Sequence, residues 1–224
     1  MAKQRSYKLL CPIARALDKV GDRWTLLILR DLHAGPARFT DLQEGLTGIA
    51  ANLLTDRLGK LVDDGLVNKG NGPHGSTLYE LTELGHETGD VIFELAMLGA
   101  RFPSIAEPVR PGNLRTVAVT LSSAAKRVNA GDLEVVASLE VDGEAFELCA
   151  GNGSAAVTYG AAVDPDVTLE TRYTDLIALS EGEITEQAFL DRYCEITVHR
   201  AGKEQALFQL FGLILNVLRG QGGG

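Results

Sequence analysis

The chain has 224 residues, 45% of them hydrophobic, and a mean hydropathy of +0.04. This composition indicates a globular protein, and the length suffices for one large domain or two ordinary ones with buried cores. The first residues are polar and basic, and no apolar run approaches the roughly eighteen residues of a membrane span, so we expect a cytoplasmic protein. The cysteines Cys11, Cys149 and Cys194 are odd in number and far apart, which argues against a disulfide framework and a zinc site.

The formal net charge of −9 is unevenly distributed along the chain. Residues 1–75 carry 11 Lys and Arg against 8 Asp and Glu, residues 76–110 carry 2 against 6, and residues 111–224 carry 8 against 16. The basic front suits contact with phosphate groups, whereas the acidic rear faces another kind of partner. The basic excess is small, and proteins that never contact nucleic acid often have one of this size.

Four helices are expected before residue 65, at 12–20, 23–32, 40–47 and 50–64. Gly21 ends the first helix, and Asp22 is a suitable N-cap for the second. Thr40 and Gln43 have the spacing of a capping box at the start of the third. The fourth helix has an apolar seam that consists of Leu54, Leu58, Leu61 and Val62.

The residues after Gly65 predict a β-hairpin followed by one long helix. Strands are expected at 66–69 and 77–81, joined by a glycine-rich loop. Thr82 can cap a helix over 83–101, whose apolar stripe consists of Leu84, Val91, Leu95 and Leu98, widened by Ile92 and Ala96. The order of these elements is that of a winged helix-turn-helix. Because the stripe is wider than one small module needs, we expect this helix to contribute to a dimer interface.

A proline-rich stretch marks the expected domain boundary. It predicts a linker at 103–113 between domains at 1–102 and 114–219, and the glycine-rich tail at 220–224 should be disordered. The pattern behind the linker predicts an α+β domain. Its helices are expected at 114–128, 173–181, 185–192 and 203–218. Its strands are expected at 133–141, 144–150, 154–160, 166–172 and 194–200.

The helix at 50–64 is the candidate for reading DNA, because a helix enters the major groove with its N-terminal residues nearest to the bases. With the seam facing the core, the outward residues near its start are Ala51, Asn52, Thr55, Asp56 and, at the flank, Arg57. Asn52 can read an adenine edge, Arg57 a guanine or a phosphate, and Thr55 either a base or a phosphate. The alternative for each of them is a solvated surface residue.

Basic residues around this helix are candidates for phosphate contacts: Arg38, Lys60 and Lys69. Lys69 and His74 flank the predicted wing, which would lie against the DNA backbone or the minor groove. A loop histidine without a partner is more often simply solvated, and this alternative stands for His74.

Several motifs between residues 9 and 100 follow one another in a fixed order: CPI (11–13), GDRWTLLILR (21–30), GPARF (35–39), LLTDRL (53–58), DGLV (64–67) and YELTELG (79–85). In this order and spacing they resemble the HxlR-type transcriptional regulators. The resemblance implies a homodimer held by the first and last helices of the module, with the helix at 50–64 reading duplex DNA. The residues AAN at 50–52 depart from the serine and lysine of many relatives, and the wing is short, so the operator sequence cannot be transferred.

Cys11 has two interpretations. Some regulators that resemble this chain use a cysteine at this position to sense oxidants or electrophiles. Cys11 precedes Pro12 at a helix start, with Lys8 and Arg15 nearby, so the helix dipole would favour its thiolate. The alternative is a small buried apolar residue.

The rear part carries softer motifs at 135–141, 143, 165–171, 174–179 and 182–185, followed by an apolar last helix. Over residues 114–218 it resembles the sterol-carrier-protein-like domains, which implies helices and a sheet around an apolar tunnel. The candidate ligand-binding residues are Phe146, Leu176, Phe189, Phe208, Phe211 and Leu215. The last helix has almost no polar face, so core, ligand or partner must cover it. Core or dimer packing is the alternative to a ligand tunnel.

The leading hypothesis is therefore a DNA-binding regulator, controlled by an apolar ligand or lipid in its rear domain or by thiol oxidation. The alternative is a lipid-carrier protein whose winged helix makes protein contacts. An enzyme is disfavoured, because the sequence has no G-x-S-x-G, H-E-x-x-H or P-loop motif and its four histidines are scattered. We expect no cofactor and no metal.

Overall fold

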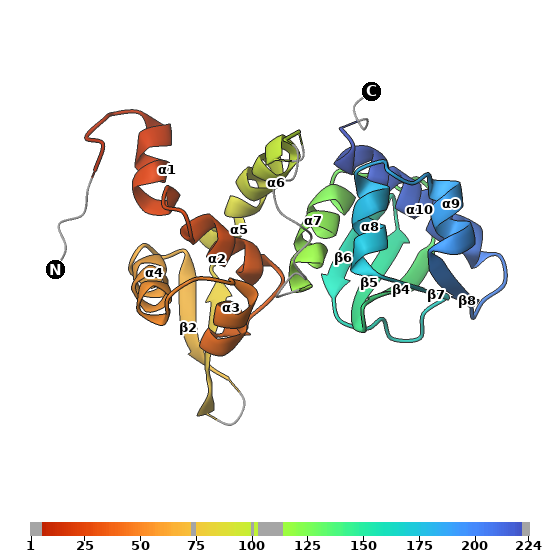
Figure 1. The fold of residues 1–224 in the computed structure, drawn as a ribbon, viewed down its shortest axis with the longest axis horizontal. Helices are drawn as coiled ribbons and strands as arrows, with labels where there is room; N and C mark the ends of the chain where they lie inside the picture. Colours follow the sequence, from red (N-terminus) through yellow and green to blue (C-terminus); the bar gives the residue numbers. More distant parts are fainter. Residues whose placement is uncertain (1–5, 73–74, 100, 103–113, 221–224) are drawn as a thin grey trace. The chain divides into compact units, whose positions relative to one another are not determined.

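The computed structural model describes residues 6–72, 75–99, 101–102 and 114–220, and the chain divides into two compact units (Figure 1). The division falls between Ile92 and Phe93, inside one helix. The linker expected at 103–113 lies outside the described residues, as does all but the first residue of the expected tail. No helix in the described parts of the chain is long and apolar enough to cross a bilayer.

The first unit combines helices with a small antiparallel sheet. Its helices are α1 (Pro12–Val20), α2 (Thr25–His33), α3 (Phe39–Gly45), α4 (Ala51–Asp63), α5 (Glu83–His86) and the beginning of α6 (Thr88–Gly99). Its strands are β1 (Ala37–Arg38), β2 (Val67–Asn71) and β3 (Thr77–Leu81), in the order β1-β3-β2. This arrangement confirms the predicted winged helix-turn-helix. β1 escapes prediction because two residues are too few to show an alternating pattern.

One face of α4 anchors it in the core of the first unit. Leu54, Leu58 and Leu61 are almost fully buried and Val62 is half-buried, as the predicted seam requires. They pack in one cluster with apolar residues of α2 and α3. Burial of each leucine side chain stabilises the folded state by about 1.5–3 kcal/mol. The seam therefore fixes which face of α4 points outward.

The single helix predicted over 83–101 is wrong, because the structure interrupts it at Glu87. The Glu87 N–H reaches the carbonyl oxygen three residues earlier at 3.3 Å, and the Thr88 hydroxyl donates to the Gly85 carbonyl at 2.7 Å. A side chain that bonds back to the preceding turn competes with helical hydrogen bonds. The Thr88 oxygen also lies 3.0 Å from Nε2 of His33 on α2, so a tertiary contact accompanies the break.

The second unit is an α+β domain with one five-stranded sheet. Its strands are β4 (Val135–Val141), β5 (Glu144–Gly151), β6 (Ser154–Tyr159), β7 (Val167–Thr171) and β8 (Cys194–Val198). They lie in the order β6-β5-β4-β7-β8, with β4 and β7 parallel and the other neighbours antiparallel. Its further helices are α7 (Arg115–Ala125), α8 (Tyr173–Ser180), α9 (Glu186–Arg192) and α10 (Lys203–Leu218). These bounds agree with the predicted ones to within a few residues.

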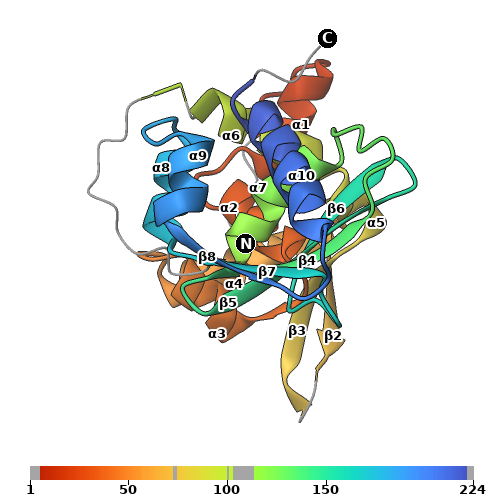
Figure 2. The same ribbon diagram turned by 90° about the vertical axis from the view of Figure 1, so that its right-hand side faces the viewer.

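The helices of the second unit cover one face of its sheet (Figure 2). On that face Leu139 of β4 pairs with Phe146 and Leu169 of the neighbouring strands, and all three are nearly fully buried. The core also contains Phe93 of α6, whose ring centroid lies 4.0 Å from the guanidinium carbon of Arg127. Core packing accounts for the apolar character of α10, whose buried residues are Leu207, Leu210, Phe211, Ile214 and Leu215.

Candidate nucleic-acid interface

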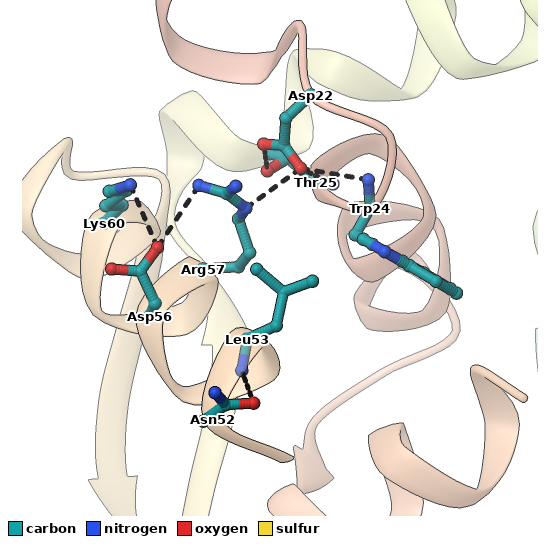
Figure 3. Close-up of polar contacts among 8 residues, drawn as sticks. All are labelled: Asp22, Trp24, Thr25, Asn52, Leu53, Asp56, Arg57 and Lys60. Carbon is teal, nitrogen blue, oxygen red and sulfur yellow. Dashed lines mark hydrogen bonds and ion pairs between the residues drawn. The ribbon is translucent and has the colours of Figure 1, made fainter. Parts of the chain in front are cut away.

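The first turns of α4 present the residues that were predicted to face DNA. Ala51, Asn52, Thr55 and Asp56 are exposed, away from the buried leucine seam. Oδ1 of Asn52 accepts the Leu53 N–H at 3.0 Å (Figure 3), and the Thr55 hydroxyl donates to the Ala51 carbonyl at 2.9 Å. The Asn52 amide nitrogen can therefore still donate to a base or a phosphate.

Arg57 differs from these neighbours because its side chain turns toward the segment between α1 and α2 (Figure 3). Its Nε lies 3.0 Å from Oδ1 of Asp22, and its Nη1 lies 3.3 Å from Oδ2 of Asp56. The Arg57 side chain is 22% exposed, whereas that of Lys60 is 54% exposed. We predicted an outward position at the flank of α4. The structure instead pairs Arg57 with an acidic residue that lies far away in the sequence.

Asp22 is itself held by the start of α2. Its Oδ1 accepts the N–H groups of Trp24 at 3.0 Å and Thr25 at 3.2 Å, and its Oδ2 accepts the Thr25 hydroxyl. The helix begins at Thr25 rather than at Arg23, but Asp22 still satisfies N–H groups at its start, as a capping residue does. One carboxylate thus joins the α1–α2 turn, α2 and α4.

Two further ion pairs involve α4. Lys60 lies 2.9 Å from Asp56, one turn earlier on the same helix, and Lys19 of α1 pairs with Asp64 at the C-cap of α4. An exposed ion pair within one helix, such as that of Lys60 and Asp56, contributes only about 0–1 kcal/mol to stability. A DNA phosphate can therefore compete with Asp56 for Lys60.

The small sheet of the first unit carries two of the predicted phosphate ligands. Arg38 of β1 and Lys69 of β2 are exposed, and β3 lies between their strands. The β2–β3 hairpin projects from the helices of the first unit (Figure 1). His74 lies outside the described residues.

Large apolar side chains are uncovered on α1 and α6. Ile13 and Leu17 on α1, and Val91, Leu95 and Leu98 on α6, are each at least 44% exposed. These residues belong to the apolar rows that the sequence shows at helical spacing. The core of a single chain does not cover them, and large exposed apolar patches mark interaction sites.

The three cysteines lie in different environments. Cys11 is exposed at the N-cap of α1, so the alternative of a buried apolar residue is wrong for the single chain. Burial, with a smaller contribution from the charge of Asp191, raises the pKa of Cys194 to about 11. Burial and the charge of Glu147 also raise the pKa of Cys149. Cys11 is therefore the exposed thiol of the three.

The second unit contains a small, mainly apolar cavity of about 120 Å³ between α7, α8 and α10. Leu176 and Leu215, two of the predicted ligand-binding residues, line it together with Thr120 and Ser180. Phe208 lies elsewhere, at an open depression beside α10 with a volume of about 660 Å³. Three of the six predicted residues therefore line a hollow, two in the small cavity and one in the open depression.

The other three predicted residues fill the solid core. Phe146 and Phe189 are completely buried and Phe211 is nearly so, and none of them lines either hollow. The rings of Phe189 and Phe211 stack with their centroids 5.9 Å apart.

Comparison with known proteins shows which family the first part of the chain resembles. The sequence profile of the HxlR-like helix-turn-helix family matches residues 19–106. An HTH-type transcriptional regulator of Synechocystis is 32% identical over 93 residues, which cover 41% of this chain and 69% of that protein. The HTH-type transcriptional regulator YtfH of Escherichia coli is 34% identical over 88 residues, 38% of this chain and 70% of its own.

A mycobacterial relative and a solved structure match similar shares of the chain. An HTH-type transcriptional regulator of Mycobacterium tuberculosis is 39% identical over 94 residues, which are 40% of this chain and 58% of that protein. The reduced form of the transcriptional regulator YodB from Bacillus subtilis is 28% identical, with a TM-score of 0.38. The match covers 44% of this chain and 100% of that one.

Proposed function

The chain belongs to the HxlR-like helix-turn-helix family of DNA-binding transcriptional regulators, and we propose that it reads duplex DNA as a homodimer with α4 in the major groove. The observation that carries this proposal is the exposure of Asn52 and Thr55 together at the start of α4, while the leucine seam holds the opposite face in the core. The major groove, about 12 Å wide, accommodates a helix in this orientation. Asn52 and Thr55 then contact base edges.

Basic residues around α4 supply the contacts to the DNA backbone. Arg38 on β1 and Lys69 on the wing are exposed, and Lys60 is exposed on α4 itself. From the sequence, we also propose His74 as a phosphate ligand. Such contacts position a protein on DNA without reading its sequence.

Salt dependence of DNA binding tests this proposal. Operator fragments are selected from genomic DNA with the full-length protein, and fluorescence anisotropy then measures affinity over a range of salt concentrations. We expect Lys69→Ala and Arg38→Ala to weaken binding to operator and random DNA alike, and each to reduce the salt slope by about 1. Lys126→Ala, at an exposed lysine of the second unit, is the matched control and should change neither. Absence of salt-dependent duplex binding would overturn the proposal.

The dimer forms through α1 and α6. The exposed rows on these helices supply the apolar area that an interface core needs. A two-fold symmetric dimer presents two copies of α4 to two half-sites, separated by about one turn of DNA or a multiple of it.

Cys11 makes DNA binding responsive to oxidants. The thiol is exposed at the start of α1, beside the apolar row of that helix, whereas the two other thiols are partly buried. A peroxide converts an accessible thiolate into a sulfenic acid, which a thiol reductant reverses. A polar group at this place disturbs the apolar surface through which α1 forms the dimer.

The second unit is a sterol-carrier-like effector domain that binds a small apolar molecule. Its cavity of about 120 Å³ is far below the roughly 300–1,000 Å³ of ordinary ligand sites, and it approaches the about 150 Å³ of an apolar cavity that holds benzene. We therefore propose an effector no larger than one ring. A lipid-carrier function is not favoured, because the relatives are transcriptional regulators and an acyl chain exceeds the cavity.

A thermal-shift measurement on the full chain tests the effector site. Phenol should raise the melting temperature of the wild type, and it should have no effect on Leu176→Phe, whose larger side chain fills the cavity. Equal shifts in both proteins would show that phenol binds elsewhere.

A further inference from the structure

We infer that Asp22 and Arg57 form a positioning pair that sets the orientation of α4 against the α1–α2 turn. Arg57 then acts on DNA recognition through the placement of the reading helix, and it does not read a base itself. This inference rests on the proposed function, in which α4 enters the major groove.

The first step of the argument is that Asp22 is a fixed point. Its carboxylate accepts the N–H groups of Trp24 and Thr25 at 3.0 and 3.2 Å, and it also accepts the Thr25 hydroxyl. Thr25 is a buried residue, only 2% exposed. A carboxylate with three local donors at a helix start has little freedom to follow a partner that moves. The arginine on α4 must therefore adjust to Asp22.

The second step is that the leucine seam alone leaves the rotation of α4 loosely defined. Apolar burial is non-directional, so Leu54, Leu58 and Leu61 determine which face is covered but tolerate small rotations about the helix axis. The ion pair between Arg57 and Asp22 instead joins two defined atoms, one on α4 and one in the turn before α2. The contact of 3.0 Å between Nε of Arg57 and Oδ1 of Asp22 lies beside the seam, where it opposes such rotation.

The size of the effect follows from helix geometry. Side-chain ends lie roughly 5–6 Å from the axis, so a rotation of 10° moves them by about 1 Å. Binding constellations tolerate only about 0.5 Å of misplacement. Loss of the pair therefore moves Asn52 and Thr55 out of hydrogen-bonding register with the bases, although the fold persists.

The third step is that α4 is tied to α1 at its other end as well. Lys19 in the last turn of α1 pairs with Asp64, the C-cap of α4. Together the two ion pairs connect the reading helix to α1 and to the turn that follows it. Since α1 also carries part of the proposed dimer surface, the pairs set the orientation of α4 relative to that part.

The substitution Asp22→Asn separates positioning from direct contact, because the two roles predict opposite signs. Asparagine retains an oxygen that caps α2 but lacks the charge that holds Arg57. If Arg57 contacted DNA directly, its release and the removal of a negative charge would leave operator affinity unchanged or increase it. If Arg57 positions α4, operator affinity falls about 5- to 100-fold, while affinity for random DNA stays within about twofold.

Two controls accompany this variant. Asp63→Asn removes the same charge from an exposed position on α4 without touching Arg57, and it should not reduce the ratio of operator to random affinity. Arg57→Gln should lose operator affinity to a similar extent. The double variant should lose no more than either single variant, because the two residues act as one unit. Additive losses would overturn the inference.

A melting experiment excludes general damage. The side chains of Arg57 and Asp22 are 22% and 29% exposed, so solvent weakens their ion pair. Its removal should therefore lower the melting temperature by less than about 4 °C. Should Asp22→Asn unfold the unit, Asp22→Ser provides another uncharged capping oxygen for the same measurement. If Asn52→Ala loses operator preference and a folded Asp22 variant keeps it, the positioning role of Asp22 and Arg57 is overturned, and the proposed reading of DNA by α4 stands. No loss in Asn52→Ala would overturn the proposed reading of DNA by α4.

Discussion

Asn52 and Arg57 lie on the same helix, yet the Asn52 side chain is exposed whereas that of Arg57 is paired with Asp22 at 3.0 Å. Both residue types can read bases in the major groove. In the free chain only Asn52 is exposed for that task. The two side chains therefore contribute to recognition in different ways, and substitutions can separate them.

Replacing Asn52 by alanine should weaken binding to the operator by about 1–3 kcal/mol, the usual contribution of a base contact. Binding to random DNA should not change, because Asn52 supplies no charge. Competition anisotropy with both duplexes measures the two affinities together. An equal loss on both would reassign Asn52 to the DNA backbone.

A charge in the exposed row of α6 should dissociate the proposed dimer. Leu95→Glu places a carboxylate at an apolar residue that is 46% exposed in the single chain, and burial of an unpaired charge is costly. We expect a shift from dimer to monomer in light scattering at micromolar concentration, and a loss of DNA affinity. Val163→Glu introduces the same charge at an exposed apolar residue of the second unit and should leave the dimer intact. A wild-type monomer under these conditions would contradict the proposed interface.

Mild peroxide should lower the DNA affinity of the wild type, and a thiol reductant should restore it. Cys11→Ser should abolish this response, because the oxidised atom is then missing. Cys194→Ser is the control, since the raised pKa of Cys194 keeps its thiol protonated and poorly reactive. A peroxide response that persists in Cys11→Ser would leave Cys11 without a sensing role.

The stability of the second unit should depend on pH through Asp166, a buried carboxylate. Burial raises its pKa, but hydrogen bonds from Arg200 at 2.6 Å and the Val136 N–H at 2.8 Å outweigh it and lower the pKa below its ordinary value. A lowered pKa means that the carboxylate stabilises the fold above the unfolded pKa, about 3.9, and that this stability is lost as pH falls through the folded value.

The corresponding test is chemical denaturation of the wild type and Asp166→Asn. The variant should be less stable at pH 7 by about 1–3 kcal/mol, because the hydrogen bond from Arg200 loses its charged acceptor. The difference should shrink below about pH 4. A difference that is constant from pH 7 to pH 3 would mean that Asp166 acts through packing alone.

Most of the secondary structure could be predicted from the sequence because its patterns are local. The helix expected at 50–64 is α4 over Ala51–Asp63, and its seam is buried as expected. The five strands of the second unit were predicted because Val135, Ala137 and Leu139, for example, alternate with less buried residues on one strand. The turn signals between them, such as Asp142-Gly143, are local too.

The features that escaped prediction depend on contacts between distant segments. The break at Glu87 accompanies a contact between Thr88 and His33, and the inward turn of Arg57 depends on Asp22. Three of the four phenylalanines expected around a tunnel, Phe146, Phe189 and Phe211, lie in the core, since the space inside a domain depends on how facing elements pack. Sequence patterns show that such residues are buried but not what surrounds them.

The most direct test of the central claim, that two copies of α4 read the major groove, is a methylation-protection footprint on the selected operator. Dimethyl sulfate modifies guanine N7, an atom that lies in the major groove. We predict two protected half-sites related by approximate two-fold symmetry, with their centres about 10–10.5 base pairs apart or a multiple of that spacing. Unprotected major-groove guanines at a bound operator, or a single protected site, would contradict it.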